Sequence, residues 1–222
     1  MSALDPLPNP ARNIRYLVCF AMREEARHFA LPQVRGGIAV TGIGSRNAEK
    51  SIRELLASAA KCEVITSGFA GGLNPEIKRG EVLWDADESF SLAGQLARGD
   101  GRRGSFHCSN RIAATAPEKT ALRKQTGADA VEMESAIIRA VCREKGVPSA
   151  TIRVISDAAD ENLPLDFNAL MSADQSMNYW KLARSLIRNP GKIPKLIRLQ
   201  QEINESSRRL AAFLEKLLRE GR

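Results

Sequence analysis

The chain has 222 residues, of which 43% are hydrophobic and 27% charged, a composition typical of a globular protein with one core. It contains no run of about 20 apolar residues, as a membrane-spanning helix requires, and no basic and apolar leader, so we expect a cytoplasmic protein. The net charge of +7 comes from residues 178–222, which hold 11 Lys and Arg against 4 Asp and Glu. Such an excess fits an ordinary basic surface helix or peripheral contact with an anionic membrane, and we expect no nucleic-acid partner.

Metal and nucleotide-cofactor sites are not expected. The four cysteines and two histidines are widely scattered, without the close spacing of a transition-metal site, and the thiols fit reduced, structural positions. Gly42-Ile-Gly44 lacks the third glycine of a dinucleotide fingerprint, and the phosphate-loop pattern ending in Gly-Lys-Ser/Thr is absent.

In the first half of the chain, short apolar runs alternate with amphipathic segments. Residues 15–21 are predicted to form a strand, followed by a short helix from Glu24. Further strands are predicted at 37–42, 64–67 and 81–85, with a helix over 47–60 and a glycine-rich turn over 68–72. Residues 91–104, rich in Gly, Arg and Ser, are expected to form a loop.

The second half continues the alternation and ends in helices. We predict a helix at 118–125, a strand at 128–131 that turns into a helix near Met133, a strand at 150–155 and a loop from 157. Met133, Ile137 and Val141 are expected to form the core face of that middle helix. Two basic helices are expected over 174–219, with a break at 189–191. The pattern predicts one α/β domain over 1–222, with its core at 14–170 and a largely parallel sheet flanked by helices.

Acidic residues lie at the ends of two expected strands. Glu132 and Glu134 occupy a strand-to-helix junction, and Asp157 ends the next strand, where open α/β sheets bind ligands. On a helix the two glutamates would point about 200° apart, so at most one would line a pocket unless Glu132 is still in the strand. The alternative is that the glutamates cap the helix N-terminus and that Asp157 is an ordinary turn residue.

Six segments of the chain carry a family resemblance when they are taken in their order: Ala21-Met-Arg-Glu-Glu25, Thr41-Gly-Ile-Gly44, Thr66-Ser-Gly-Phe-Ala-Gly-Gly-Leu73, Lys78-Arg-Gly-Glu-Val82, Ala130-Val-Glu-Met-Glu-Ser-Ala136 and Arg153-Val-Ile-Ser-Asp-Ala-Ala-Asp160. They resemble the nucleoside phosphorylase and nucleosidase superfamily, and the last two segments are the most specific. Within this superfamily the sequence is most similar to the hopanoid-associated nucleosidase branch, because of its short middle and basic tail. The resemblance implies a three-layer α/β fold with a mostly parallel or mixed central sheet and a helical C-terminal extension.

The resemblance also implies residue roles in cleaving the N-glycosidic bond of a purine-type nucleoside, in which the leaving base must be protonated. Asp157 would be the general acid that serves the purine N7, and Glu25 would activate the attacking water. Glu134 would accept hydrogen bonds from the ribose hydroxyls, and Met133 would pack against the sugar. The other expected substrate-binding positions are Glu132, Phe69, Ala70, Gly71, Ile112 and Ser156.

Two departures from the family pattern bear on the reaction. Phe69 stands where the nucleosidases carry a small hydroxyl residue, and the phosphate-binding arginines of the phosphorylases have no clear match. Since phosphate needs several donors or cations, hydrolysis is favoured over phosphorolysis, in which Arg23 or Arg46 would bind phosphate as co-substrate. A third hypothesis is a non-catalytic nucleoside-binding or membrane-associated protein. By resemblance we expect a homodimer, and the base and the 5′ substituent stay open.

Overall fold

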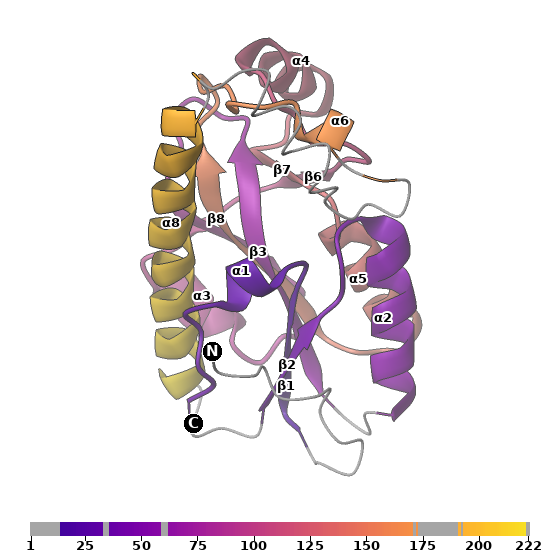
Figure 1. Ribbon diagram of the computed structural model, residues 1–222. Coiled ribbons are helices and arrows are strands. Elements are labelled where there is room, and N and C mark those ends of the chain that lie inside the picture. Colours follow the sequence, from indigo (N-terminus) through magenta and orange to yellow (C-terminus); the bar gives the residue numbers. More distant parts are fainter. Residues whose placement is uncertain are drawn as a thin grey trace.

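The structure is a computed structural model that describes residues 14–32, 36–58, 62–170, 172, 191 and 193–220. Its strands form one eight-stranded sheet of order β2-β1-β3-β8-β4-β5, with β7 beside β3 and β6 beside β7 (Figure 1). Parallel pairs predominate, but β4 runs antiparallel to β8, and β7 runs antiparallel to β3. The strands are β1 (Tyr16–Phe20), β2 (Gly36–Val40), β3 (Glu63–Gly72), β4 (Val82–Ala86), β5 (Arg102–Arg103), β6 (Phe106–Cys108), β7 (Ala130–Glu132) and β8 (Ser149–Asp157).

Helices cover both faces of the sheet, which confirms the predicted three-layer α/β class with its mixed sheet and C-terminal helix. One core cluster joins α8 to buried residues of β1, β3 and β8, and a second joins α2 and α5 to β1. Figure 1 accordingly shows α8 along one side of the sheet and the pair α2 and α5 along the other. The helices are α1 (Arg23–Ala26), α2 (Ser45–Ser58), α3 (Ala93–Arg98), α4 (Ala116–Thr126), α5 (Ser135–Glu144), α6 (Phe167–Leu170) and α8 (Ile193–Glu220).

Several local predictions are wrong. The glycine-rich segment 68–72 is the end of β3 rather than a turn, and the expected loop 91–104 contains α3 and β5. Helix α5 begins at Ser135, so Met133 is buried but precedes the helix. Of the predicted core face, Val141 is buried and Ile137 packs partly buried against the core, which the helix also contacts through Ile138 and Cys142. The predicted helix from 174 lies outside the described residues.

Strand β3 changes its neighbour part-way along one edge. Its ladder with β1 ends at Ser67, and its ladder with β7 begins at Gly71. The backbone of residues 68–70 is therefore not paired with either strand on this edge, and its polar groups need other partners. The opposite edge of β3 stays paired with β8 from Val64 to Gly71.

Helix α8 packs through its C-terminal half and leaves its first turns in solvent. Leu210, Leu214 and Leu218 are buried in the core, at the four-residue spacing of one helix face. Ile193 and Ile197 are 44% and 54% exposed near its N-terminus. Among the described residues, no helix has the length and hydropathy needed to cross a bilayer.

Candidate active site

A buried arginine lies beside the stretch of β3 that has no strand partner on one edge, because Arg153 is opposite Gly68 in the β3–β8 ladder. Arg153 points from the middle of β8 and is 1% exposed. Its Nη2 donates to Glu132 Oε2 at 2.7 Å and to Thr66 Oγ1 at 3.2 Å, and lies 3.6 Å from Glu134 Oε2. Its Nε and Nη1 are buried without a hydrogen-bond partner. Buried donors normally have a hydrogen-bond partner. The two unpaired donors therefore make the guanidinium a candidate for contact with a ligand or a water molecule.

Glu132 is the carboxylate that fixes this arginine. As the last residue of β7 it is still in the strand, so its side chain and that of Glu134 both reach Arg153. Its Oε2 also accepts from the backbone N–H groups of Glu134 and Ser135, at 3.0 and 2.7 Å. Burial opposes ionisation of Glu132, but Arg153 and these N–H donors hold its pKa below the usual range. Glu132 therefore fills the predicted capping role and also anchors the ion pair.

Glu134 is the more weakly paired of the two glutamates. It lies just before α5, is 5% exposed, and accepts one hydrogen bond from Gly44 N–H at 2.8 Å. Burial raises its pKa to about 7, with Arg153 opposing the rise and Glu132 and Glu25 adding to it. At neutral pH this carboxyl group is thus poised between its two protonation states.

Glu25 closes the opposite side of the cluster from α1. Its Oε2 accepts from the N–H groups of Ala21 and Met22 at 2.8 and 3.0 Å, and its Oε1 accepts from Phe69 N–H at 2.9 Å. The last bond uses one of the β3 backbone groups left free by the change of strand neighbour. Burial raises the pKa of Glu25, although Arg153 and the three N–H groups lower it. A carboxylate with a raised pKa is suited to taking a proton from water.

Gly68 leaves the space in which Glu25 and Arg153 approach each other. A Cβ atom at this position would lie 2.3 Å from Glu25 Oε1 and 2.5 Å from Arg153 Nη1. Its φ of +148° is also a conformation that residues with a side chain rarely adopt. Only glycine allows both groups to reach the backbone of β3 here.

Asp157 forms a second carboxylate centre at the end of β8. Its Oδ2 pairs with Lys119 Nζ at 2.5 Å, and its Oδ1 is 2.6 Å from Ser156 Oγ. A Cβ atom at Gly71 would lie 3.3 Å from Oδ2, so Asp157 lies beside Gly71 as Glu25 lies beside Gly68. Two residues lie between the two glycines, which are therefore three strand positions apart, roughly 10 Å at about 3.3 Å per residue.

The comparisons with known proteins agree with this architecture. A sequence model of the phosphorylase superfamily matches residues 93–188, which include Lys119, Arg153 and Asp157. Over these residues the chain is similar to the phosphorylase superfamily. The aminodeoxyfutalosine nucleosidase of Helicobacter pylori is 45% identical over 56 residues, which is 24% of this chain and 24% of that relative.

Solved structures of low sequence identity have a similar fold along nearly the whole chain. Futalosine hydrolase of Helicobacter pylori has a TM-score of 0.65 at 21% identity, covering 94% of this chain and 98% of that one. The 5′-methylthioadenosine/S-adenosylhomocysteine nucleosidase of Helicobacter pylori, bound to butyl-thio-DADMe-Immucillin-A, has a TM-score of 0.64 at 20% identity, covering 93% and 99%. At this identity the likeness shows the fold.

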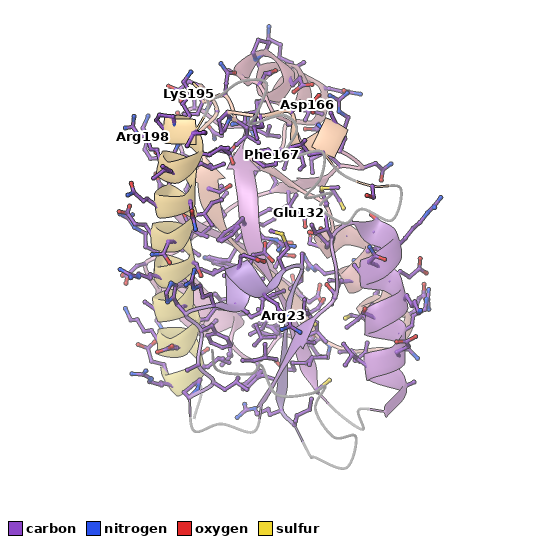
Figure 2. The ribbon with its side chains drawn as sticks, in the orientation of Figure 1. Arg23, Glu132, Asp166, Phe167, Lys195 and Arg198 are labelled. Atoms are coloured by element: carbon purple, nitrogen blue, oxygen red, sulfur yellow. The ribbon has the colours of Figure 1, made fainter. Side chains whose placement is uncertain are left out.

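The structure brings most of the predicted site residues together beside β3. Glu25, Glu132 and Glu134 surround Arg153, with Met133 buried between the last two. Phe69 contributes its N–H to Glu25, and Ser156 lies beside Asp157 with Ala70 O 3.3 Å from its hydroxyl. Figure 2 shows Glu132 near the middle of the molecule, between α8 and α2.

Ile112 and the two candidate phosphate-binding arginines are placed differently. Ile112 N–H donates to Asn168 Oδ1 at 2.8 Å, and Asn168 Nδ2 donates back to Ile112 O at 2.9 Å, which ties this segment to α6. Arg23 and Arg46 are exposed. No cluster of three metal-ligating side chains occurs among the described residues.

Arg153 and Lys119 are the functional candidates that the sequence analysis did not assign. Arg153 had a readable signal, since it is the single charge in the apolar strand Thr-Ile-Arg-Val-Ile, and a buried charge requires partners. Lys119 had none, because lysines are rarely buried and its neighbours in α4 are mostly polar.

Proposed function

We propose that this protein is a nucleosidase that hydrolyses the N-glycosidic bond of a purine-type nucleoside. The observation that carries the proposal is the presence of two separate acid centres along β3, Glu25 beside Gly68 and Asp157 beside Gly71. Water attacks the anomeric carbon from the face opposite to the base, so the group that activates the water and the group that protonates the base must lie on opposite sides of the glycosidic bond. Two separate carboxyl groups can meet this requirement, whereas a single one cannot.

In the proposed reaction, Glu25 takes a proton from water as the oxygen attacks the anomeric carbon. The bond between that carbon and the base breaks, its electron pair moves to the base, and Asp157 gives a proton to the base nitrogen. Glu134 accepts hydrogen bonds from the ribose hydroxyls, and Met133 packs against the sugar. The free Nη1 of Arg153 lies next to Glu25 and is placed to donate to the attacking oxygen.

The charge of the cluster favours water over phosphate as the attacking group. Arg153 supplies one positive charge and faces Glu25, Glu132 and Glu134. With Glu132 ionised, the ion pair is already neutral, and ionisation of either other carboxyl group makes the cluster negative, which repels a phosphate anion. Phosphorolysis is the alternative, and it requires the exposed Arg23 or Arg46 to move to the cluster. A rate that rises from zero with added phosphate would establish it.

The substrate is tested by release of free base from a panel in phosphate-free buffer. The relatives named for methylthioadenosine, adenosylhomocysteine and aminodeoxyfutalosine define the panel, together with adenosine, inosine and an adenosine carrying a 5′ lipid. We expect at least one purine nucleoside to be cleaved. Binding of these nucleosides without base release would instead identify a nucleoside-binding protein.

The N-terminal turns of α8 support peripheral contact with an anionic membrane as an accompanying proposal. Ile193 and Ile197 are exposed there, beside the exposed cations Lys195 and Arg198, which Figure 2 labels at one end of the helix. Apolar and basic side chains together favour an anionic lipid surface, where a nucleoside linked to a hopanoid lipid would be found. The fraction of protein that co-sediments with anionic vesicles should be lower for Ile197→Asp than for the unchanged protein. Equal recovery of the two proteins in the supernatant would contradict membrane contact through these turns.

A homodimer remains a prediction from the resemblance. Sedimentation equilibrium at micromolar concentration should give twice the 24.3 kDa mass of the chain, and a single 24.3 kDa species would contradict it.

A further inference from the structure

Lys119 is a fully buried lysine that the proposed reaction does not yet use. It lies in the first turns of α4 and is 0% exposed. Its ammonium group contacts three acceptors: Asp157 Oδ2 at 2.5 Å, Ala158 O at 2.7 Å and Glu161 O at 2.9 Å. An ammonium group has three N–H donors, so all of them are used, and they are directed at the last residue of β8 and the segment that follows it.

This arrangement fixes one oxygen of Asp157 and leaves the other available. Oδ2 receives the Lys119 proton donor and also faces Gly71. Oδ1 faces the Ser156 hydroxyl at 2.6 Å. Oδ2 already accepts a charge-assisted hydrogen bond from the Lys119 ammonium group, which makes it a poor site for a proton of its own. A proton taken up by Asp157 therefore resides on Oδ1.

Ser156 allows the proton to be held and released at Oδ1. Its hydroxyl donates to Oδ1 when the carboxyl group is ionised, and Ala70 O at 3.3 Å offers it a second acceptor. Rotation of this one hydroxyl frees Oδ1 for a base nitrogen, while Lys119 stays in place.

The other charged groups near this pair have partners of their own. The Glu161 carboxylate accepts from Ala158 N–H at 2.7 Å and pairs with Arg79 at 2.7 Å. Arg79 also pairs with Glu202 of α8. Lys119 is thus the one cation that the described structure pairs with Asp157.

We propose that Lys119 is the positioning residue of the general acid: it holds Oδ2 of Asp157 so that Oδ1 carries the proton to the leaving base. The inference rests on the proposed nucleosidase function. Lys119 keeps its own proton throughout, and its charge stabilises the carboxylate that forms when Asp157 gives up its proton to the base.

A double-mutant cycle on the purine nucleoside cleaved by the unchanged protein tests the inference. Lys119→Met should lower kcat on the order of 10- to 100-fold, part of the roughly 10²- to 10⁴-fold that general acid catalysis contributes, and leave KM within about threefold. Asp157→Asn should lose the whole rate enhancement that general acid catalysis provides. Because Lys119 acts through Asp157, the double variant should be no slower than Asp157→Asn alone.

Additive losses in the double variant would overturn the inference, since Lys119 would then act through the fold rather than through the acid. Lys124→Met, at an exposed position of the same helix, is the matched control and should retain full activity. If Lys119→Met does not fold, Lys119→Gln retains a donor for the loop carbonyls without the charge, and the same cycle applies. Absence of base release by the unchanged protein contradicts the proposed function and the inference with it, whereas additivity contradicts the inference alone.

Discussion

Arg153 faces three buried carboxyl groups, and their unequal surroundings divide the roles among them. Glu132 has the shortest contact to the guanidinium and two backbone donors, so it stays ionised. Glu134 has a longer contact to the guanidinium and one backbone donor, so the effect of burial is the largest and raises its pKa. Groups of the same type are thus given different pKa values by their partners, a pattern typical of enzyme sites.

The raised pKa of Glu134 predicts a pH-dependent stability. Its pKa of about 7 in the folded state exceeds the ordinary value of 4.5, so between these values the folded state binds more protons than the unfolded state and stability falls as pH rises. Relative to Glu134→Gln, the unchanged protein should lose on the order of 3 kcal/mol from pH 4.5 to 7, at about 1.4 kcal/mol per pKa unit. Urea unfolding of both proteins across this range measures the difference, and parallel curves would contradict it.

Asp157→Asn should reduce kcat for a purine nucleoside by roughly 10²- to 10⁴-fold, because an amide cannot donate the acidic proton. The melting temperature is the check on the fold, and Asp160→Asn, at an exposed position in the following loop, is the control that should retain activity. Full activity in Asp157→Asn would remove it from the mechanism.

At the scale of elements, the glycines of β3 set the distance between the two acid centres. Gly68→Ala places a Cβ within 2.5 Å of both Glu25 and Arg153, so one of them must move. We expect at least a 100-fold loss of kcat and a lower melting temperature. The control is Gly94→Ala in α3, where the nearest atom to the new Cβ would be the flexible end of Arg98 at 3.5 Å. It should leave kcat unchanged and should not lower the melting temperature, since alanine stabilises a helix by up to about 1 kcal/mol relative to glycine. Wild-type kinetics in Gly68→Ala would contradict the placement of Glu25.

Helix α8 supports α1, the short helix that carries Glu25. The buried Ser207 hydroxyl is 3.2 Å from both Glu24 O and Glu25 O at the end of α1. Ser207→Ala should lower the free energy of unfolding by about 1 kcal/mol and reduce kcat more than it changes KM, because Glu25 loses a support. Gln201→Ala, an exposed change on the same helix, is the control for helix propensity. A KM effect without a kcat effect would show that α8 acts on binding instead.

Which elements could be predicted depended on the range of the interactions that form them. β1, α2, β4 and α4 follow from local periodicity and were placed to within a few residues. The segment 68–72 was predicted as a turn because its glycines favour one locally, whereas β8 and β7 pair with it from more than 50 residues away. β6 and α6 are short and were not predicted.

Across the whole molecule, the candidate acids lie in segments that carry the family resemblance, whereas only one of the two buried cations has a sequence signal. Glu25, Glu132, Glu134 and Asp157 are in those segments, but the groups that they contact depend on where β8 and α4 pack. The buried arginine of β8 stands out as the single charge in an apolar strand. Lys119 meets Asp157 from 38 positions earlier in the chain, a contact that only the tertiary structure defines. The fold class could therefore be predicted from sequence, whereas the contacts and pKa values of the candidate site residues require the structure.

The most direct test of the account is the initial rate of base release from a cleaved purine nucleoside, with and without added phosphate, together with identification of the sugar product. Hydrolysis at the Glu25 and Arg153 centre predicts the same rate in both buffers and a free sugar. A rate that depends on phosphate, with a sugar 1-phosphate as product, would contradict it.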